Sequence, residues 1–157
     1  MLGAAIALYL LARSDKGQVF VTDILSSGTR GIRNNNPGNI RKSATVWAGQ
    51  APAKEQTDAA FVRFTAPEFG IRAMAKILKN YFARGTDTIE EIISTWAPAS
   101  ENDTAAYIAN VSRATGLAPT ARVSAADLTR IIPAIIQHEN GSQPYSLDLI
   151  NKGISLS

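Results

Sequence analysis

Glu139 is the residue of this chain whose position best fits a role in chemistry. It follows Ile135 and Ile136 near the end of the apolar-striped segment 128–139, just before an Asn-Gly pair. A carboxylate in the last turn of a helix lies against the negative end of the helix dipole, which disfavours the ionised form and costs stability. A carboxyl group kept neutral beside an apolar wall is suited to protonating a leaving group. We therefore expect Glu139 to be a general acid that acts on a glycosidic bond.

Three further carboxylates are candidates for the site. Glycoside hydrolysis commonly uses a second carboxylate, whose separation from the acid distinguishes inverting from retaining enzymes. Asp58 and Glu55 lie in a polar connection on the expected far wall of a cleft, although both also fit ordinary solvated charges. Glu101 immediately precedes a helix, where the positive dipole end favours the ionised form and a capping role. For Glu139 itself, the structural alternative is a surface ion pair.

Amide side chains that suit a sugar are concentrated in the segment 34–39. Asn35, Asn36 and Asn39 carry donors and acceptors that match the N-acetyl and hydroxyl groups of a saccharide. The same residue types tolerate left-handed backbone and bond their own main chain, so the segment fits a purely architectural turn equally well.

Aromatic candidates for stacking on a sugar face are Tyr107, Tyr145 and Trp47. Trp47 is the better cleft candidate of the two tryptophans, the other being Trp96. Tyr107 recurs at core-facing spacing, and this favours burial with a hydrogen-bonded hydroxyl.

The elements that must position these residues are mainly helical. Thr88 with Glu91 is typical of a capping box, and Gly153 is expected to stop the last helix. The pattern around Val46–Trp47 and Phe61–Phe64 predicts a small antiparallel hairpin. The predicted fold class is therefore mainly α (α+β), a helical domain with a small β-hairpin. The expected helices cover residues 67–84, 89–96, 104–115, 125–139 and 146–152.

Composition limits the classes of site. The chain has 157 residues, 45% of them hydrophobic, no cysteine and one histidine. This fits one compact domain and excludes disulfides, thiolate metal sites and a cysteine nucleophile, and neither a metal nor an organic cofactor is expected.

The net charge of +3 favours mildly anionic partners. Nucleic acid is placed last among the partners, because its candidate contacts flank one polar loop without aromatic interleaving: Arg30, Arg33, Arg41 and Lys42.

The N-terminal segment has a different composition. Leu2 to Ala12 is an uninterrupted apolar run followed by Arg13 and Lys16. Eleven helical residues rise only about 16 Å, which is short of a bilayer core. We expect a helix that associates with a membrane or docks on a partner protein, with the first core helix as the alternative. The predicted division is residues 1–28 for this helix and linker and 29–157 for the catalytic domain.

Several separated motifs occur in a recognisable order: Asn36-Pro37-Gly38-Asn39-Ile40-Arg41, Trp47-Ala48-Gly49, Phe61-Val62-Arg63-Phe64, Trp96-Ala97-Pro98 and Tyr107-Ile108. This order resembles flagellar-type glucosaminidases, members of the lysozyme-like superfamily that cut peptidoglycan glycan strands. In that family the helix bearing the catalytic glutamate precedes the asparagine-rich segment, whereas here only Asp15 and Asp23 are acidic residues before it.

The missing helix end has a counterpart at residues 135–145, which read Ile-Ile-Gln-His-Glu-Asn-Gly-Ser-Gln-Pro-Tyr. This segment resembles the helix end of lytic transglycosylases, including the downstream Gln-Pro pair. We interpret the chain as a circularly permuted lysozyme-like domain, because domain termini often lie close together. The interpretation predicts that the C-terminal part folds back beside the asparagine-rich bend and places Glu139 in a sugar-binding groove.

Residues 30–146 also resemble phage virion-associated murein hydrolases or structural proteins, with Arg-Asn-Asn-Asn-Pro-Gly-Asn near the start and His-Glu-Asn-Gly near the end. The resemblance implies a virion component that cleaves peptidoglycan in the periplasm or cell wall of the host. Glu139 would protonate the glycosidic oxygen, and water assisted by Asp58 or Glu55, or the sugar's own hydroxyl, would complete the reaction. The alternative is a non-catalytic virion structural or wall-binding protein on the same scaffold.

Overall fold

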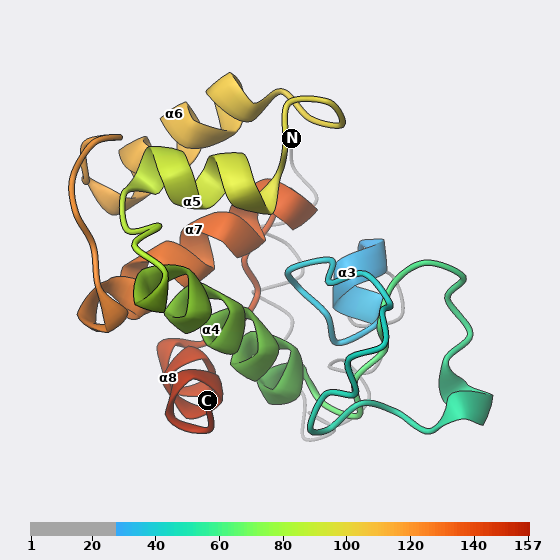
Figure 1. Ribbon diagram of the computed structural model, residues 1–157. Coiled ribbons are helices and arrows are strands. Elements are labelled where there is room, and N and C mark those ends of the chain that lie inside the picture. The colour runs from blue at the N-terminus through green and yellow to red at the C-terminus, as the bar shows by residue number, and fades with distance from the viewer. Residues whose placement is uncertain (1–27) are drawn as a thin grey trace, which may run out of the picture.

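The computed structural model describes residues 28–157, and helices dominate them, which confirms the mainly helical prediction (Figure 1). The expected helix from Leu2 to Ala12 lies outside the described residues. Among the residues that are described, no helix combines the length and the apolar character needed to cross a membrane. The elements are, in chain order, α3 (Arg30–Arg33), the 3-10 turn η1 (Ala53–Glu55), α4 (Pro67–Ala83), α5 (Ile89–Trp96), α6 (Thr104–Thr115), η2 (Ala125–Asp127), α7 (Leu128–Asn140) and α8 (Leu147–Ser155).

Helix α7 lies at the centre of the helical part. It packs against α6 on one side and α8 on the other, and it also contacts α4 and α3 (Figure 1). The predicted apolar face of this helix is confirmed, because its side chains are fully buried: Leu128, Ile131, Ile132, Ile135 and Ile136. The buried face fixes the rotation of α7 about its axis and therefore the direction in which residues at its C-terminal end project.

The helix starts agree with the local sequence signals. The Thr88 hydroxyl accepts a hydrogen bond from the Glu91 N–H, and the Glu91 carboxylate accepts one from the Thr88 N–H, which completes the predicted capping box. Asp103 caps α6 by accepting from the Ala106 N–H at 3.0 Å. These side chains satisfy backbone donors that have no partner inside the helix.

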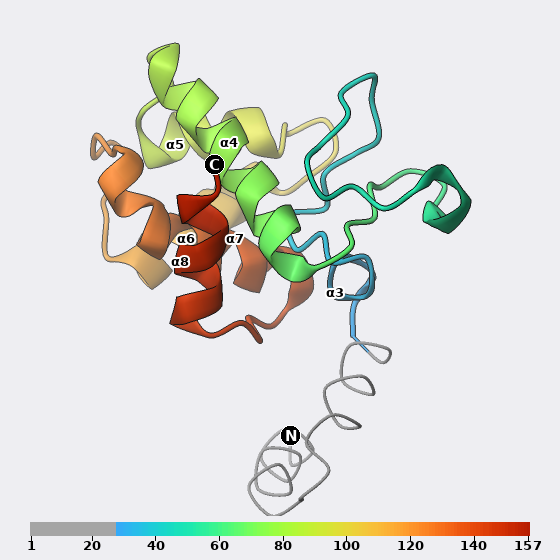
Figure 2. The ribbon, with the colours of Figure 1, turned by 90° about the horizontal axis from the view of Figure 1, so that it is seen from below.

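The predicted end of the last helix at Gly153 is wrong, because α8 continues through this residue to Ser155. A Cβ atom at position 153 would lie 2.5 Å from Cγ2 of Ile71. The glycine therefore allows close packing between α8 and α4, which lie side by side in Figures 1 and 2. The helix ends only after the chain has passed this contact.

Residues 34–66 form a lobe of loops, here called the loop lobe, that projects from the end of α4 (Figures 1 and 2). The predicted hairpin is reduced to two isolated antiparallel bridges, Arg41 with Phe61 and Gln50 with Phe64. The Gln56 side chain donates hydrogen bonds to the carbonyls of Ala51 and Arg63 and accepts one from the Arg63 N–H. The Gln56 amide thus hydrogen-bonds backbone N–H and carbonyl groups that would otherwise pair with a neighbouring strand.

Candidate functional site

A cleft of about 510 Å³ lies between the loop lobe and the helical part of the protein. Its wall combines aromatic rings, aliphatic side chains, two amides, a guanidinium and two carboxyl groups, a mixture that is typical of ligand sites. The helical part contributes Ile77, Tyr81, Trp96, Ala97, Pro98, Glu101, Asn102 and Glu139, and the loop lobe contributes Gly38, Asn39, Ile40, Arg41 and Phe61.

Glu139 lines this cleft and accepts three hydrogen bonds from three different parts of the chain. Its Oε1 accepts from the Tyr107 hydroxyl at 2.8 Å and from the Trp96 indole N–H at 3.1 Å. Its Oε2 accepts from the Asn39 amide at 2.9 Å. Together these bonds hold the carboxyl group in one orientation.

The two carboxyl oxygens of Glu139 accept different numbers of hydrogen bonds. Each carboxyl oxygen has two lone pairs. Oε1 uses both to accept from Tyr107 and Trp96, whereas Oε2 uses only one, for Asn39. The remaining lone pair of Oε2 is therefore the position at which this carboxyl group can hold, give or take a proton.

Tyr107 shows the burial that its spacing favours: it lies in the core, outside the cleft wall, and its hydroxyl donates to Glu139. Burial, the neighbouring carboxylate charge and the hydrogen bond to it all raise the pKa of Tyr107. The hydroxyl therefore stays protonated and acts as a donor. The His138 ring stacks on Tyr107, with ring centroids 3.6 Å apart, and its Nδ1 lies 3.3 Å from the Asn110 amide nitrogen.

The end of α7 is attached directly to the asparagine-rich bend, as the sequence analysis predicted. The Asn140 amide donates to the Pro37 carbonyl at 2.8 Å, and its Oδ1 accepts from the Thr29 hydroxyl at 2.5 Å. A Cβ atom at Gly31 would lie 2.6 Å from this Oδ1, so a glycine is needed where α3 approaches α7. These contacts place the residue before Asn140, which is Glu139, in the wall of the cleft.

The three candidate asparagines divide into one cleft residue and two architectural ones. Asn39 lines the cleft, adopts a positive φ of 49° and bonds Glu139. Asn36 is fully buried and bonds the backbone of Ile40 and Val62. Asn35, with a φ of 52°, donates to the Phe64 carbonyl. Of these three asparagines, only Asn39 is therefore in a position to contact a ligand in this cleft.

Asp58 lies outside the cleft wall and organises the loop lobe instead. Its carboxylate accepts hydrogen bonds from Arg30 at 2.7 Å, from the Asn34 amide at 2.8 Å, and from the backbone N–H groups of Ala60 and Phe61. Burial opposes ionisation, but these bonds outweigh it and hold the pKa of Asp58 well below its usual range. We therefore assign Asp58 a structural role.

The other two candidate carboxylates are exposed. Glu55 lies in η1 and does not line the cleft. Glu101 does line the cleft and pairs with Arg41 at 3.0 Å, and the side chains remain 62% and 67% exposed respectively. Within the described residues, Glu101 is therefore the one carboxylate that shares the cleft with Glu139.

The preference for Trp47 over Trp96 as a cleft residue is reversed. Trp47 packs against the hydrophobic core outside the cleft wall, and Trp96 both lines the cleft and donates to Glu139. Tyr145 is also outside the cleft wall, and burial raises the pKa of its hydroxyl to about 12. Sequence spacing alone could not separate the two tryptophans, although Trp96 ends a helix, where a side chain lies close to the following loop.

Sequence reasoning missed Tyr81 and Phe61 as cleft residues, and it treated Arg41 only as a possible nucleic-acid contact. The spacing of Tyr81 in its helix predicts only a core position, whereas in the structure this residue both packs against the core and lines the cleft. In the part of the chain that is described, no group of three or more His, Asp or Glu side chains is placed to bind a metal.

The fold and the site define a mainly helical protein with a cleft in which one glutamate is oriented by three hydrogen-bond donors. The chain is similar to protein P5 of Pseudoalteromonas phage PM2, with 37% identity over 150 residues that cover 93% of this chain and 92% of protein P5. The chain belongs to the family of this phage protein, which confirms the prediction of a phage relationship. No family model matches the chain.

Proposed function

We propose that the protein is a phage virion component that cleaves the glycan strands of peptidoglycan, with Glu139 as the general acid, on a circularly permuted lysozyme-like scaffold. The observation that supports this most directly is the orientation of Glu139 in the cleft by Tyr107, Trp96 and Asn39, which leaves one lone pair on Oε2 for a proton. Preorganisation of this kind is what general acid catalysis requires.

In the proposed reaction, the glycan lies along the cleft and Oε2 of Glu139 transfers its proton to the glycosidic oxygen. The bond between this oxygen and the anomeric carbon breaks, and positive charge develops on the sugar ring. A hydroxyl oxygen then forms a bond to the anomeric carbon, and its proton returns to Glu139. Tyr81, Trp96 and Phe61 offer aromatic surface for the apolar faces of the sugar rings.

The distribution of carboxylates favours the transglycosylase form of this reaction, in which the attacking hydroxyl belongs to the sugar itself. A hydrolase usually holds a second carboxylate in the site to activate water or to form a covalent intermediate. The Asp58 carboxylate lies outside the cleft and accepts hydrogen bonds from Arg30 and Asn34. Glu101 is exposed and paired with Arg41. Glu139 is therefore left to act first as acid and then as base.

The test is digestion of purified sacculi by the wild-type protein and by Glu139→Gln. The variant keeps an oxygen for Tyr107 and Trp96 but loses the transferable proton, so activity should fall at least about a thousandfold while the fold is retained. Glu90→Gln, an exposed change on α5, is the matched control and should keep full activity. Clearing of sacculi by Glu139→Gln at the wild-type rate would contradict the proposal.

Mass spectrometry of the products separates the possible chemistries. Anhydro-muramic ends are expected for intramolecular attack, and reducing muramic or glucosamine ends would indicate hydrolysis at one or the other bond. The proposed virion location follows from the family relationship with a phage protein and is tested by detecting the protein in purified particles. The segment from Leu2 to Ala12 would attach it to a virion membrane or to another virion protein.

A non-catalytic virion structural or wall-binding role is the second candidate. One observation favours it: every partner of Glu139 is a hydrogen-bond donor, which is also how a protein fixes a structural carboxylate. Under this alternative the wild-type protein binds sacculi without releasing fragments, and Glu139→Gln mainly lowers the melting temperature.

A further inference from the structure

We propose that Arg41 binds a carboxylate of the peptide branches carried by the glycan, so that these branches contribute to binding of the strand in the cleft. The identity of the polymer rests on the proposed function, but the role of Arg41 is argued from its own surroundings. These are its place in the cleft, its exchangeable ion pair with Glu101 and the charge of the surrounding face.

Arg41 is held at the wall of the cleft by an aromatic contact. Its guanidinium lies 5.5 Å from the centroid of the Phe61 ring, and that of Arg30 lies 4.6 Å from the same ring. Both Arg41 and Phe61 line the cleft, and a bridge between their backbones fixes their spacing. Cation–π packing of this kind limits the directions a guanidinium can take and leaves its N–H groups for a ligand.

Arg41 already binds a carboxylate, that of Glu101, and this pair is easily exchanged. The pair joins the loop lobe to the connection between α5 and α6, with Nη2 and Oε2 3.0 Å apart. Both side chains are about two-thirds exposed, and exposed pairs of this kind contribute little free energy. A ligand carboxylate that enters the cleft can therefore replace Glu101, and the fork of donors on Arg41 allows two parallel hydrogen bonds.

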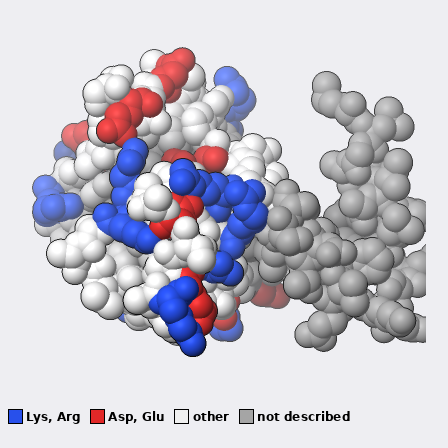
Figure 3. All heavy atoms as spheres, turned by 90° about the vertical axis from the view of Figure 1, so that its right-hand side faces the viewer, with Lys and Arg blue, Asp and Glu red and all other residues white. Residues whose placement is uncertain are grey.

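The face around Arg41 favours an anionic ligand. Figure 3 views the loop lobe side of the molecule, where Lys and Arg side chains gather with only a few acidic ones between them. Residues 29–66 contain two acidic residues, Glu55 and Asp58, and six basic ones: Arg30, Arg33, Arg41, Lys42, Lys54 and Arg63. The charge of Asp58 is neutralised by its ion pair with Arg30.

This charge identifies the part of the polymer that Arg41 meets. The sugar units of an intact peptidoglycan strand are uncharged, because the lactyl carboxyl group of each muramic acid is joined to a peptide, whereas the peptide branches carry free carboxylates. A basic cleft wall therefore gains nothing from the sugar rings of an intact strand by charge, but it attracts the branches and concentrates them near the site. We assign Arg41 as a specificity-determining residue for these branches.

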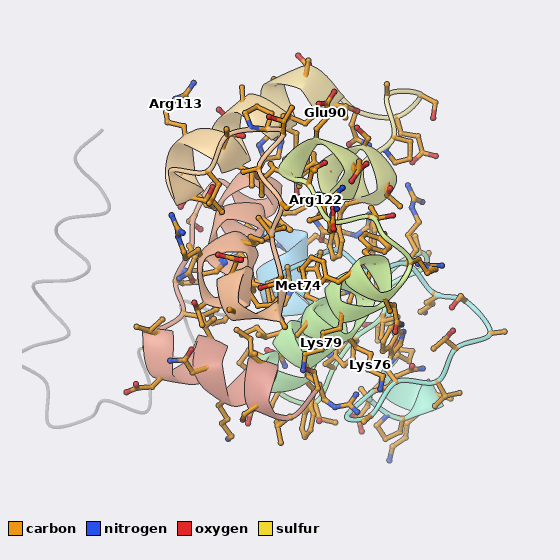
Figure 4. All side chains as sticks on the ribbon, turned by 60° about the vertical axis from the view of Figure 1, so that its left-hand side comes forward. Met74, Lys76, Lys79, Glu90, Arg113 and Arg122 are labelled. Carbon is orange, nitrogen blue, oxygen red and sulfur yellow. The ribbon has the colours of Figure 1, made fainter. Side chains whose placement is uncertain are left out.

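The test measures binding to sedimented sacculi, with the full chain carrying Glu139→Gln so that no cleavage intervenes. Intact sacculi are compared with stripped sacculi, whose peptides have been removed by an amidase and whose lactyl carboxyl groups, freed by that cleavage, have been converted to uncharged amides. Adding Arg41→Gln should weaken binding to intact sacculi roughly three- to tenfold and leave binding to stripped glycan unchanged. Arg122→Gln is the control, because Arg122 is also exposed and paired, with Asp87 at 2.6 Å, and lies away from the loop lobe (Figure 4).

Glu101→Gln should change binding to intact sacculi in the opposite direction. Removing the competing carboxylate should strengthen binding to intact sacculi roughly two- to threefold, and the gain should disappear when Arg41→Gln is added. Equal binding to intact and stripped sacculi, or loss on both substrates with Arg41→Gln, would overturn the assignment even if Glu139 proves catalytic. A protein that binds neither substrate would overturn it together with the proposed polymer, and the digestion assay then reports separately on the proposed function.

Discussion

The helical part and the loop lobe are built by different kinds of interaction. In residues 67–157, buried apolar faces and local caps such as Thr88 determine the structure. In residues 34–66, two isolated bridges replace a sheet, and buried amide and carboxyl side chains bond the backbone in its place. A single substitution should therefore cost little at a helix cap and much more at a polar group inside the loop lobe.

The largest effect is expected for Asn36→Ala. This change removes an amide that donates to the carbonyls of Ile40 and Val62 and accepts from the Ile40 N–H, all in buried surroundings. Leaving these backbone groups without partners should lower the free energy of unfolding by about 3 kcal/mol. Chemical denaturation measures the change, and Asn80→Ala on the exposed face of α4 should change it by less than about 0.5 kcal/mol.

Asp58→Asn should have an intermediate effect that depends on pH. The folded pKa of Asp58 lies below that of an unfolded aspartate, so its carboxylate stabilises the fold above about pH 4, and this contribution is lost as the pH falls further. The variant should lose about 2 kcal/mol at neutral pH and approach the wild type in acid. Thermal unfolding across this range tests the prediction.

A difference between wild type and Asp58→Asn that stays constant with pH would show that the charge of Asp58 does not stabilise the lobe. Glu55→Gln, an exposed neighbour in η1, should leave stability unchanged at every pH.

The smallest effect is expected for Thr88→Ala. It removes the hydroxyl that accepts from the Glu91 N–H at the start of α5, and loss of a cap of this kind costs about 1 kcal/mol. Thr86→Ala, which caps no helix, is the control, and the melting temperature measures both. If Thr88→Ala cost as much as Asn36→Ala, the contrast between the two regions would not hold.

The same contrast explains what could be predicted from the sequence. Helix starts at Thr88 and Asp103 depend on residues three or fewer positions away, so a local pattern is sufficient. The end of α8 was missed because Gly153 serves contact with Ile71 on a distant helix. In the loop lobe, the short pattern around Phe61 was read as a strand because the replacement of ladder bonds by Asn36 and Gln56 has no sequence signature.

The candidate site was predictable in its main residue and not in its surroundings. Glu139 was found because an acid after an apolar helical stripe is unusual, and its proximity to Asn39 follows from the predicted return of the chain. The roles of Trp96 and Tyr107 as donors depend on the crossing of α5, α6 and α7, which no local pattern encodes. Asp58 was misjudged because a carboxylate that bonds its own loop resembles a free one in sequence.

The bond between Asn39 and Glu139 joins residues 100 positions apart, and the bond between Pro37 and Asn140 spans a similar length of chain. Contacts of such high sequence separation form late in folding, because a long loop must close before they contribute. During synthesis on the ribosome, the growing chain therefore cannot assemble the cleft until residues 139 and 140 have emerged. Products that end before residue 139 lack the cleft glutamate altogether.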